Sequence, residues 1–226
     1  MASRWEARRT TAAVIAAGEV AIDSIAAGGD GVGRVEGRVI FVPRSAPGDV
    51  GLVDVPTEGR FARVEFRELR VASPLRVQPP CTHYVVDRCG GCQLQHLGYD
   101  AQLTAKAHIV RDALQRIGRR HVELPIVSPS ALPWRYRRKL TLALRRRGDG
   151  WLAGLHPFDD SRRVFSLDDC PITHEDVLAV WRDVLTAARH LPPARELRGA
   201  VRLDDANAAS LTIEGGHEWP RSDVFF

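Results

Sequence analysis

Residues 81–92 read CTHYVVDRCGGC and contain three of the four cysteines of this 226-residue chain; the fourth is Cys170. Four thiolates are the ligand set of a tetrahedral zinc ion or of a cubane iron–sulfur cluster. The two glycines of the Cys-Gly-Gly-Cys turn allow both of its sulfurs to face one centre. The stretch therefore predicts that the middle of the chain folds around a metal site. The predicted ligands are Cys81, Cys89, Cys92 and Cys170.

The spacing of the cysteines bears on which metal is bound. A compact zinc ribbon supplies its ligands as two close Cys-x-x-Cys pairs. Here three cysteines are clustered, and the fourth stands alone and is followed by Pro171. This arrangement is more typical of an iron–sulfur site, and zinc remains the alternative. The histidines nearest to the cysteines in the sequence, His83, His96 and His156, are expected to lie on the surface or behind the ligands.

The composition is that of an ordinary globular protein, with 44% hydrophobic and 27% charged residues. No run of about 18 apolar residues is present, so no membrane-spanning helix is expected. The apolar stretch at residues 10–17 is soon interrupted by Glu19 and Asp23, which argues against a signal peptide. We therefore expect a cytoplasmic protein. Reducing conditions in the cytoplasm disfavour disulfides, so they favour metal binding by the cysteines.

Arginine accounts for 30 of the 32 basic residues, since only Lys106 and Lys139 are lysines. Guanidinium groups bind phosphates through paired hydrogen bonds and stack on bases, so the bias suits a nucleic-acid partner. A GC-rich coding sequence would produce the same bias without functional meaning. The net charge of +4 does not decide between the two interpretations.

The segment WRYRRK, residues 134–139, is the strongest candidate for contact with RNA. Interleaved arginines and aromatic rings offer phosphate contacts and stacking faces together, as recognition of single-stranded RNA requires. A solvated strand edge with an aromatic anchor would show the same pattern. The predicted RNA-binding residues are Arg135, Tyr136, Arg137, Arg138 and Lys139.

Before the cysteines, short apolar runs alternate with turn residues. They predict strands at about residues 20–25, 34–42, 50–55 and 60–69. Turn signals every ten residues or so favour a small closed barrel. The glycines at positions 28, 29, 31 and 33 fit no G-x-G-x-x-G register and precede a strand, so we interpret them as a hairpin turn and not as a phosphate-binding loop.

After the cysteines, a helix is predicted from Asp100 as N-cap to Gly118, with an apolar stripe that includes Leu103 and Leu114. Thr173 is expected to cap a second helix that ends before Pro192. Strands are expected at about 139–144, 151–155, 199–204 and 210–214. No Ser-His-Asp, His-Glu-x-x-His or paired-carboxylate arrangement is visible, so no catalytic residue is assigned.

These elements predict an α+β fold in three parts. Residues 1–17 form a flexible N-terminus, residues 18–75 a small OB-like β-barrel, and residues 76–226 a mixed α/β domain that contains the metal site. The two helices of that domain are expected at about 100–117 and 174–190. The chain ends on two adjacent aromatic residues, which indicates that the sequence stops within a longer protein.

Taken in order, these segments resemble the N-terminal part of the TRAM-containing, iron–sulfur RNA (uracil-C5) methyltransferases, particularly those that act on 23S ribosomal RNA. The resemblance runs from about residue 18 to the end of the chain. Its motifs are GDGVGR (29–34), VIFVP (39–43), APGD (46–49), CGGCQLQH (89–96) with Tyr99, Gln102, Leu103 and Lys106, WRYRRK (134–139), GLH (154–156) and CPI (170–172).

The resemblance implies that residues 18–75 are a TRAM barrel and that the four cysteines bind a [4Fe-4S] cluster. Seven residues separate Cys81 from Cys89, two more than in the family pattern, so the loop between them is expected to differ. The resemblance also implies methyl transfer to uracil C5 by a domain that lies beyond Phe226 in the family. S-adenosylmethionine is therefore expected only in the complete enzyme.

We accordingly expect this chain to bind and position RNA, ribosomal RNA by resemblance, for a separate or missing methyltransferase domain. The apolar stripe of the helix at 100–117 is expected to pack against that domain in the family and to be partly exposed here. The alternative is a stand-alone, non-catalytic RNA-binding protein with a structural iron–sulfur or zinc site.

Overall fold

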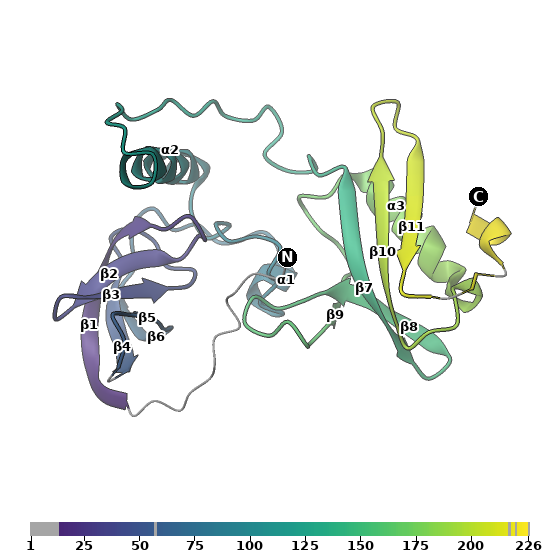
Figure 1. Cartoon of the computed structure of the whole chain (residues 1–226), viewed down its shortest axis with the longest axis horizontal. Coiled ribbons are helices and arrows are strands. Elements are labelled where there is room, and N and C mark those ends of the chain that lie inside the picture. The colour runs from purple at the N-terminus through teal and green to yellow at the C-terminus, as the bar shows by residue number, and fades with distance from the viewer. Residues whose placement is uncertain (1–13, 57, 217, 220, 226) are drawn as a thin grey trace. The chain divides into compact units, whose positions relative to one another are not determined.

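The computed structural model describes residues 14–56, 58–216, 218–219 and 221–225, and they divide into two compact units (Figure 1). Unit 1 contains the described residues up to Gln78 and the segment His96–Ser128, and unit 2 contains Pro79–Gln95 and the described residues from Pro129 onward. Both units combine a sheet with helix, so the predicted α+β class is confirmed. Residues 1–13 of the expected flexible N-terminus, and Phe226, lie outside the described residues.

Unit 1 is built on one six-stranded sheet with the order β5-β3-β2-β1-β4-β6. All neighbouring strands are antiparallel except β3 and β5, which are parallel. The described residues form no ladder between β5 and β6, so the sheet is a curled half-barrel and not the closed barrel expected from the sequence. The strands are β1 (Val14–Ile25), β2 (Gly31–Val35), β3 (Arg38–Val42), β4 (Val50–Pro56), β5 (Phe61–Arg63) and β6 (Phe66–Val71).

Gly28 and Gly29 lie in a hairpin turn, as predicted, whereas Gly31 and Gly33 lie within β2, and a second hairpin was missed. Gly29 has a φ of 87° in the β1–β2 turn. A Cβ atom on Gly33 would lie 2.2 Å from the carbonyl oxygen of Ala21, so only glycine fits there. The single strand predicted at 34–42 is instead two strands, because Glu36 and Gly37 have φ values of 49° and 81°. Positive φ at both loop positions is the pattern of a two-residue type I′ hairpin.

A buried carboxylate fastens the loops of unit 1. Asp49 is fully buried and accepts hydrogen bonds from the guanidinium of Arg76, at 2.8 Å to Oδ1 and 2.6 Å to Oδ2. It also accepts from the backbone amides of Ala46 and Ser73, at 2.6 and 2.9 Å. Burial raises the pKa of Asp49, but the hydrogen bonds from Arg76 and the two amides outweigh burial, and the pKa lies below its usual 3.8. Asp49 thus joins the turn before β4 to the chain that leaves β6.

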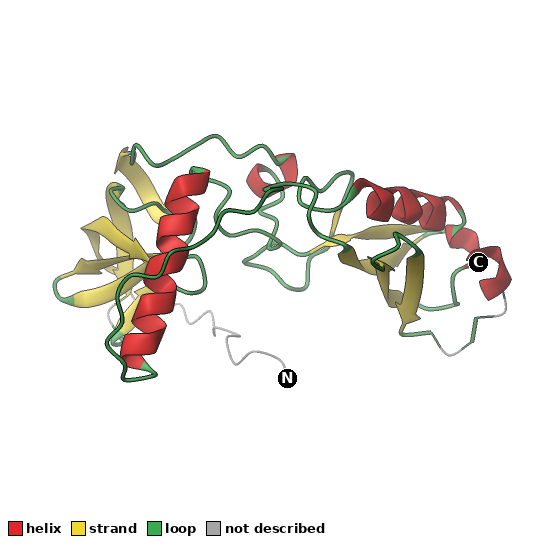
Figure 2. Ribbon diagram, turned by 90° about the horizontal axis from the view of Figure 1, so that it is seen from above, coloured by secondary structure: helices red, strands yellow, loops and turns green. Residues whose placement is uncertain are grey.

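The helix α2 (Tyr99–Arg116) belongs to unit 1, whereas the sequence analysis grouped it with the metal-site domain. It lies against the sheet of unit 1 (Figure 2) and contacts β1. Its buried residues are Ala105 and Ala107. The N-cap is Gly98 and not Asp100, which lies in the first turn, where its charge complements the helix N-terminus. The end of the apolar stripe is exposed, as expected. The exposed fractions are 45% at Val110, 39% at Leu114 and 84% at Ile117.

Unit 2 contains a five-stranded antiparallel sheet with the order β11-β10-β7-β8-β9. The helix α3 packs on one face of this sheet (Figure 1). There Trp181 of α3 donates from Nε1 to the carbonyl oxygen of Leu140 at 3.3 Å. The elements of unit 2 are α1 (Thr82–Val85), β7 (Lys139–Arg147), β8 (Gly150–Leu155), β9 (Phe165–Ser166), α3 (Glu175–Thr186), η1 (Ala188–His190), β10 (Glu196–Leu203), β11 (Ala209–Glu214) and η2 (Ser222–Phe225).

The N-cap of α3 is His174 and not Thr173. The Nδ1 atom of His174 accepts a hydrogen bond from the amide of Asp176 at 3.3 Å. Thr173 is fully buried, and its own amide donates to the carbonyl oxygen of Cys170 at 2.9 Å, so it belongs to the turn after the fourth cysteine. Along the described part of the chain, no helix is long and apolar enough to cross a membrane.

The buried carboxylate of unit 1 leads to a test by substitution. Asp49→Asn removes the charge that faces Arg76, and we expect it to destabilise unit 1 by about 2 kcal/mol at pH 7. This is below the full cost of breaking a buried ion pair, because the side chain of Arg76 is 25% exposed. Amide hydrogen exchange of β1–β4 measures the change.

The same test has a predicted pH dependence. Because the folded state lowers the pKa of Asp49, its contribution is fully present above the unfolded value near pH 4 and is lost as the pH falls through the folded pKa. The difference between wild type and variant should therefore shrink toward pH 3. Asp54→Asn is the control, since Asp54 is half exposed and lies 3.8 Å from Arg67. An equal effect of both variants would contradict the assignment.

Candidate metal centre and nucleic-acid interface

All four cysteines line one narrow pocket within unit 2. Cys81 directly precedes α1, Cys89 and Cys92 lie in the loop that follows it, and Cys170 lies in the loop that leads to α3. All four are free thiols; Cys92 is half-buried and the others are buried. Folding therefore brings the distant fourth cysteine beside the clustered three.

Backbone hydrogen bonds hold the Cys89 loop in place. The amide of Cys89 donates to the carbonyl oxygen of His83 at 2.9 Å, and the amide of Gly90 donates to that of His156, also at 2.9 Å. A Cβ atom on Gly90 would lie 3.2 Å from the same oxygen of His156, so a larger residue would crowd this contact. The amide of Gly91 points at the Sγ atom of Cys89, at 3.4 Å. Such N–H···S contacts are one way in which a protein stabilises metal-bound sulfur.

Burial controls the protonation of the thiols. Burial first, and the neighbouring cysteines second, raise the pKa of Cys89 to about 11, against the lowering effect of the Gly91 amide. Burial also raises the pKa of Cys92, while Gln95 and Arg137 lower it. Because a metal binds the thiolate, metal binding here must release protons. A buried thiol with a raised pKa is also a poor nucleophile.

The arrangement of the donors limits what the pocket can bind. Within the described residues, no three His, Cys, Asp or Glu side chains are placed to hold a metal ion. Four thiolates on one zinc ion would lie about 4 Å apart, since each is about 2.3 Å from the metal. The ligands of a cubane each bind a different iron, so they surround a larger centre. The pocket has a free volume of about 10 Å³, close to one water molecule, so its side chains would have to move apart to admit a cluster.

The three histidines near the cysteines in the sequence each have another partner, and two of them, His83 and His96, are buried and not on the surface. His83 is stacked on Phe165; its Nδ1 lies 2.7 Å from Asp87, and its Nε2 accepts from the amide of Asp168 at 3.2 Å. His156 has its Nδ1 2.8 Å from the carbonyl oxygen of Arg163. His96, in unit 1, has its Nε2 3.0 Å from the carbonyl oxygen of Ser45.

Arg135, which was predicted to contact RNA, forms hydrogen bonds with the loop that contains Cys170. Its guanidinium donates to both carboxylate oxygens of Asp169, at 2.9 and 3.2 Å, and to the carbonyl oxygen of Cys170 at 2.9 Å. Its backbone amide donates to the carbonyl oxygen of Pro171 at 2.8 Å. The hydrogen bond from Arg135 holds the pKa of Asp169 below 3.8, so this carboxylate is charged at neutral pH.

The other predicted RNA-binding residues divide into two groups. Arg137 lines the cysteine pocket, and its amide donates to the carbonyl oxygen of Ile172 at 2.8 Å. Arg138 donates to the side chain of Asn207 at 2.8 Å and to the carbonyl oxygen of Asp204, and so supports the turn between β10 and β11. Tyr136 and Lys139 are exposed. The structure thus leaves these two free to meet a ligand at the surface.

Asp169 is the residue of this site that the sequence analysis missed. It stands directly before Cys170, in an Asp-Asp-Cys-Pro run that was visible in the sequence. The signal was an acidic residue adjacent to a predicted ligand, but its partner, Arg135, lies 34 positions away. Only the folded chain shows that the two side chains meet.

The amino-acid sequence of this chain is similar to those of several bacterial proteins. No family model matches the chain. It is 39% identical over 179 residues to a protein of Halalkalibacterium halodurans, covering 76% of this chain and 38% of the relative. It is 37% identical over 188 residues to a protein of Protochlamydia amoebophila, covering 80% and 42%. It is 40% identical over 158 residues to a protein of Nostoc sp., covering 68% and 34%.

All three relatives are named uncharacterized RNA methyltransferases. The similarity supports a relationship of this chain to the RNA methyltransferases. The chain spans about two fifths of the length of the curated relatives it matches.

The contribution of Arg135 to holding the Cys170 loop can be tested by the alkylation rates of the cysteine thiols. Arg135→Gln removes the ion pair with Asp169, so the loop should open more often and expose its buried thiol. We expect the alkylation rate of Cys170 to rise several-fold, with a smaller change at Cys81. Peptide mass spectrometry after timed alkylation of the metal-free chain measures both rates.

Arg162→Gln is the matched control, because the side chain of Arg162 is 93% exposed and its nearest acidic contact is 3.9 Å away. It should leave every thiol as slow as in the wild type. An unchanged Cys170 rate in Arg135→Gln would show that the loop does not depend on this ion pair.

Proposed function

We propose that this chain is the RNA-binding and iron–sulfur portion of an S-adenosylmethionine-dependent methyltransferase that acts on uracil C5 of ribosomal RNA. In this proposal, residues 18–75 form a TRAM domain built on the curled half-barrel of unit 1. Methyl transfer is assigned to the part of the methyltransferases that this chain does not match. The observation that carries the proposal is the meeting of Cys170 with the 81–92 loop in one pocket. The similarity to RNA methyltransferases supports it independently.

The four cysteines are proposed to hold a [4Fe-4S] cluster. The donor set fits in kind and number, because four thiols, three of them buried, gather at one pocket. When bound, the cluster would link the 81–92 loop covalently to the loop before α3. The chain's own contribution is to hold these loops and to place charge beside them. The Gly91 amide points at the sulfur of Cys89, and Arg137 offers positive charge at the pocket.

RNA is proposed to meet the exposed part of the 134–139 segment. Tyr136, which is 51% exposed, offers a stacking face, and Lys139 offers a cation for a phosphate. The amides of Arg135 and Arg137 bond to the carbonyl oxygens of residues 171 and 172. Tyr136 lies between these two arginines, and Lys139 lies two residues further on. Metal binding at the cysteines would therefore make the RNA-binding segment more rigid. The proposed role of the cluster is structural.

The cluster is tested by composition and spectrum after anaerobic purification. We expect about four iron and four sulfide per chain and a broad visible absorbance band. Cys170→Ser should lose most of the iron, because it removes the ligand that joins the two loops. Ser166→Ala, on the nearby β9, is the control and should keep it. Colourless protein with one zinc per chain would replace the iron–sulfur proposal by the zinc alternative.

The reaction is tested in cells that lack the gene. Mass spectrometry of their 23S ribosomal RNA should show the loss of one 5-methyluridine, and the full-length gene should restore it. Loss of the modification from transfer RNA instead would redirect the proposal to another RNA. If every 5-methyluridine persists in both RNA classes, the proposed methyl transfer is wrong.

A further inference from the structure

The sheet of unit 2 has one face that no described helix covers. Side chains alternate along its strands, so Leu140 and Leu142 point to α3 and their neighbours point the other way. We call the second side the open face. It carries Lys139, Thr141 and Ala143 of β7 beside Arg198, Ala200 and Arg202 of β10.

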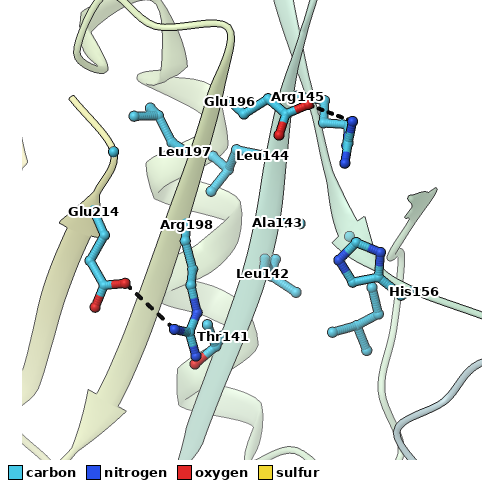
Figure 3. A pocket seen from close by; sticks show the side chains of 13 residues that line it. Thr141, Leu142, Ala143, Leu144, Arg145, His156, Glu196, Leu197, Arg198 and Glu214 are labelled. Carbon is cyan, nitrogen blue, oxygen red and sulfur yellow. Dashed lines mark hydrogen bonds and ion pairs between the residues drawn. The ribbon is translucent and has the colours of Figure 1, made fainter. Parts of the chain in front are cut away.

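Charges are balanced at one end of the open face. Arg145 lies directly opposite Glu196, with an ion pair of 2.5 Å, and Arg198 lies directly opposite Glu214, with an ion pair of 3.5 Å (Figure 3). These pairs border a shallow hollow of about 530 Å³. Opposite charges in directly facing positions stabilise a sheet. These two pairs therefore carry no excess charge, although Arg147, two residues beyond Arg145 on the same side of β7, is exposed.

The other end is unbalanced. Lys139 lies directly opposite Arg202, and both are exposed. Like charges in facing positions destabilise a sheet. Among the described residues, neither side chain has an acidic partner within ion-pair distance. The nearby carboxylate of Asp204 is used elsewhere, since it accepts from the amides of Ala206 and Ala208. An anion bound between Lys139 and Arg202 would relieve the repulsion between these two facing cations.

The surface beside this pair is small and polar. Thr141 faces Ala200 on the neighbouring strand, and Ser210 of β11 faces Arg202 and donates its hydroxyl to the carbonyl oxygen of that residue at 3.3 Å. Short side chains let a nucleic-acid backbone come close, and the hydroxyl of Thr141 can donate to a phosphate or ribose oxygen. Tyr136 lies three residues before Lys139 and supplies the aromatic ring that the open face itself lacks.

We propose that Lys139 and Arg202 form a phosphate-binding pair and that single-stranded RNA runs from there over Thr141 and Ala200. This inference rests on the proposed function and extends it to a surface that includes β10. Phosphates along one strand of RNA match two cations on adjacent strands, whereas Arg145 and Arg198 are already neutralised by Glu196 and Glu214. The RNA path is therefore expected to enter at Lys139 and Arg202.

The test measures binding of the full chain to a fluorescent single-stranded oligouridylate by anisotropy over a range of salt concentrations. Lys139→Gln and Arg202→Gln should each weaken binding by about three- to ten-fold. The double variant should flatten the plot of log K against log salt by about 1.4, which corresponds to two lost phosphate contacts on a single strand. Because both changes remove like-charge repulsion, thermal stability should be unchanged or slightly higher.

The matched control is the double variant Arg198→Gln with Glu214→Gln, which removes a balanced pair from the same face. It should bind within about two-fold of the wild type. If the wild type binds no RNA at all, the proposed function fails with the inference. If the wild type binds RNA and the Lys139 and Arg202 variants bind equally well with the same salt slope, only the phosphate pair is wrong. If they lose binding to an acidic polypeptide but not to RNA, the face docks a protein and the inference is overturned.

Discussion

The cysteine pocket depends on one contact network, in which Arg135 holds the turn that carries Cys170. Three cysteines are neighbours in the chain, and the turn at residues 169–173 carries the fourth to the same pocket. The guanidinium supplies a bidentate ion pair and a bond to a carbonyl oxygen, and the amides of Arg135 and Arg137 bond to the same turn. Hydrogen bonds between charged groups are the stronger kind, and several act here on a short stretch of backbone.

The same segment connects the pocket with the surface. Residues 134–139 enter β7, so the side chains after Arg138 alternate between the core beneath α3 and the open face. Arg135 donates to the Cys170 loop and Arg137 lines the cysteine pocket, while Tyr136 and Lys139 remain at the surface. A metal at the cysteines and an RNA at the open face would therefore act on one continuous stretch of backbone, which gives the structural site a direct relation to RNA binding.

Much of the fold was predictable because its signals are local. The alternation of apolar residues located most strands. The glycines at 28, 29, 31 and 33 indicated a hairpin turn, which is confirmed for Gly28 and Gly29, while the other two lie within β2. The hairpin at Glu36 was missed, because a glutamate with positive φ has no signature of its own in a sequence. The caps of α2 and α3 were misplaced by two and one residues, since Asp100 and Thr173 are good capping residues that tertiary contacts place elsewhere.

By itself, the sequence determined which residues are available: four cysteines with one tight turn, an arginine-rich segment with aromatic residues, and two regions of strand and helix. The tertiary structure alone decided how they are used. It assigned Arg135 to Asp169, placed Arg137 at the pocket, and set Lys139 opposite Arg202 on another strand. The reason is physical. Composition and spacing state which chemistry a chain can perform, but a side chain's partner depends on strand register and loop path, which join residues far apart in the sequence.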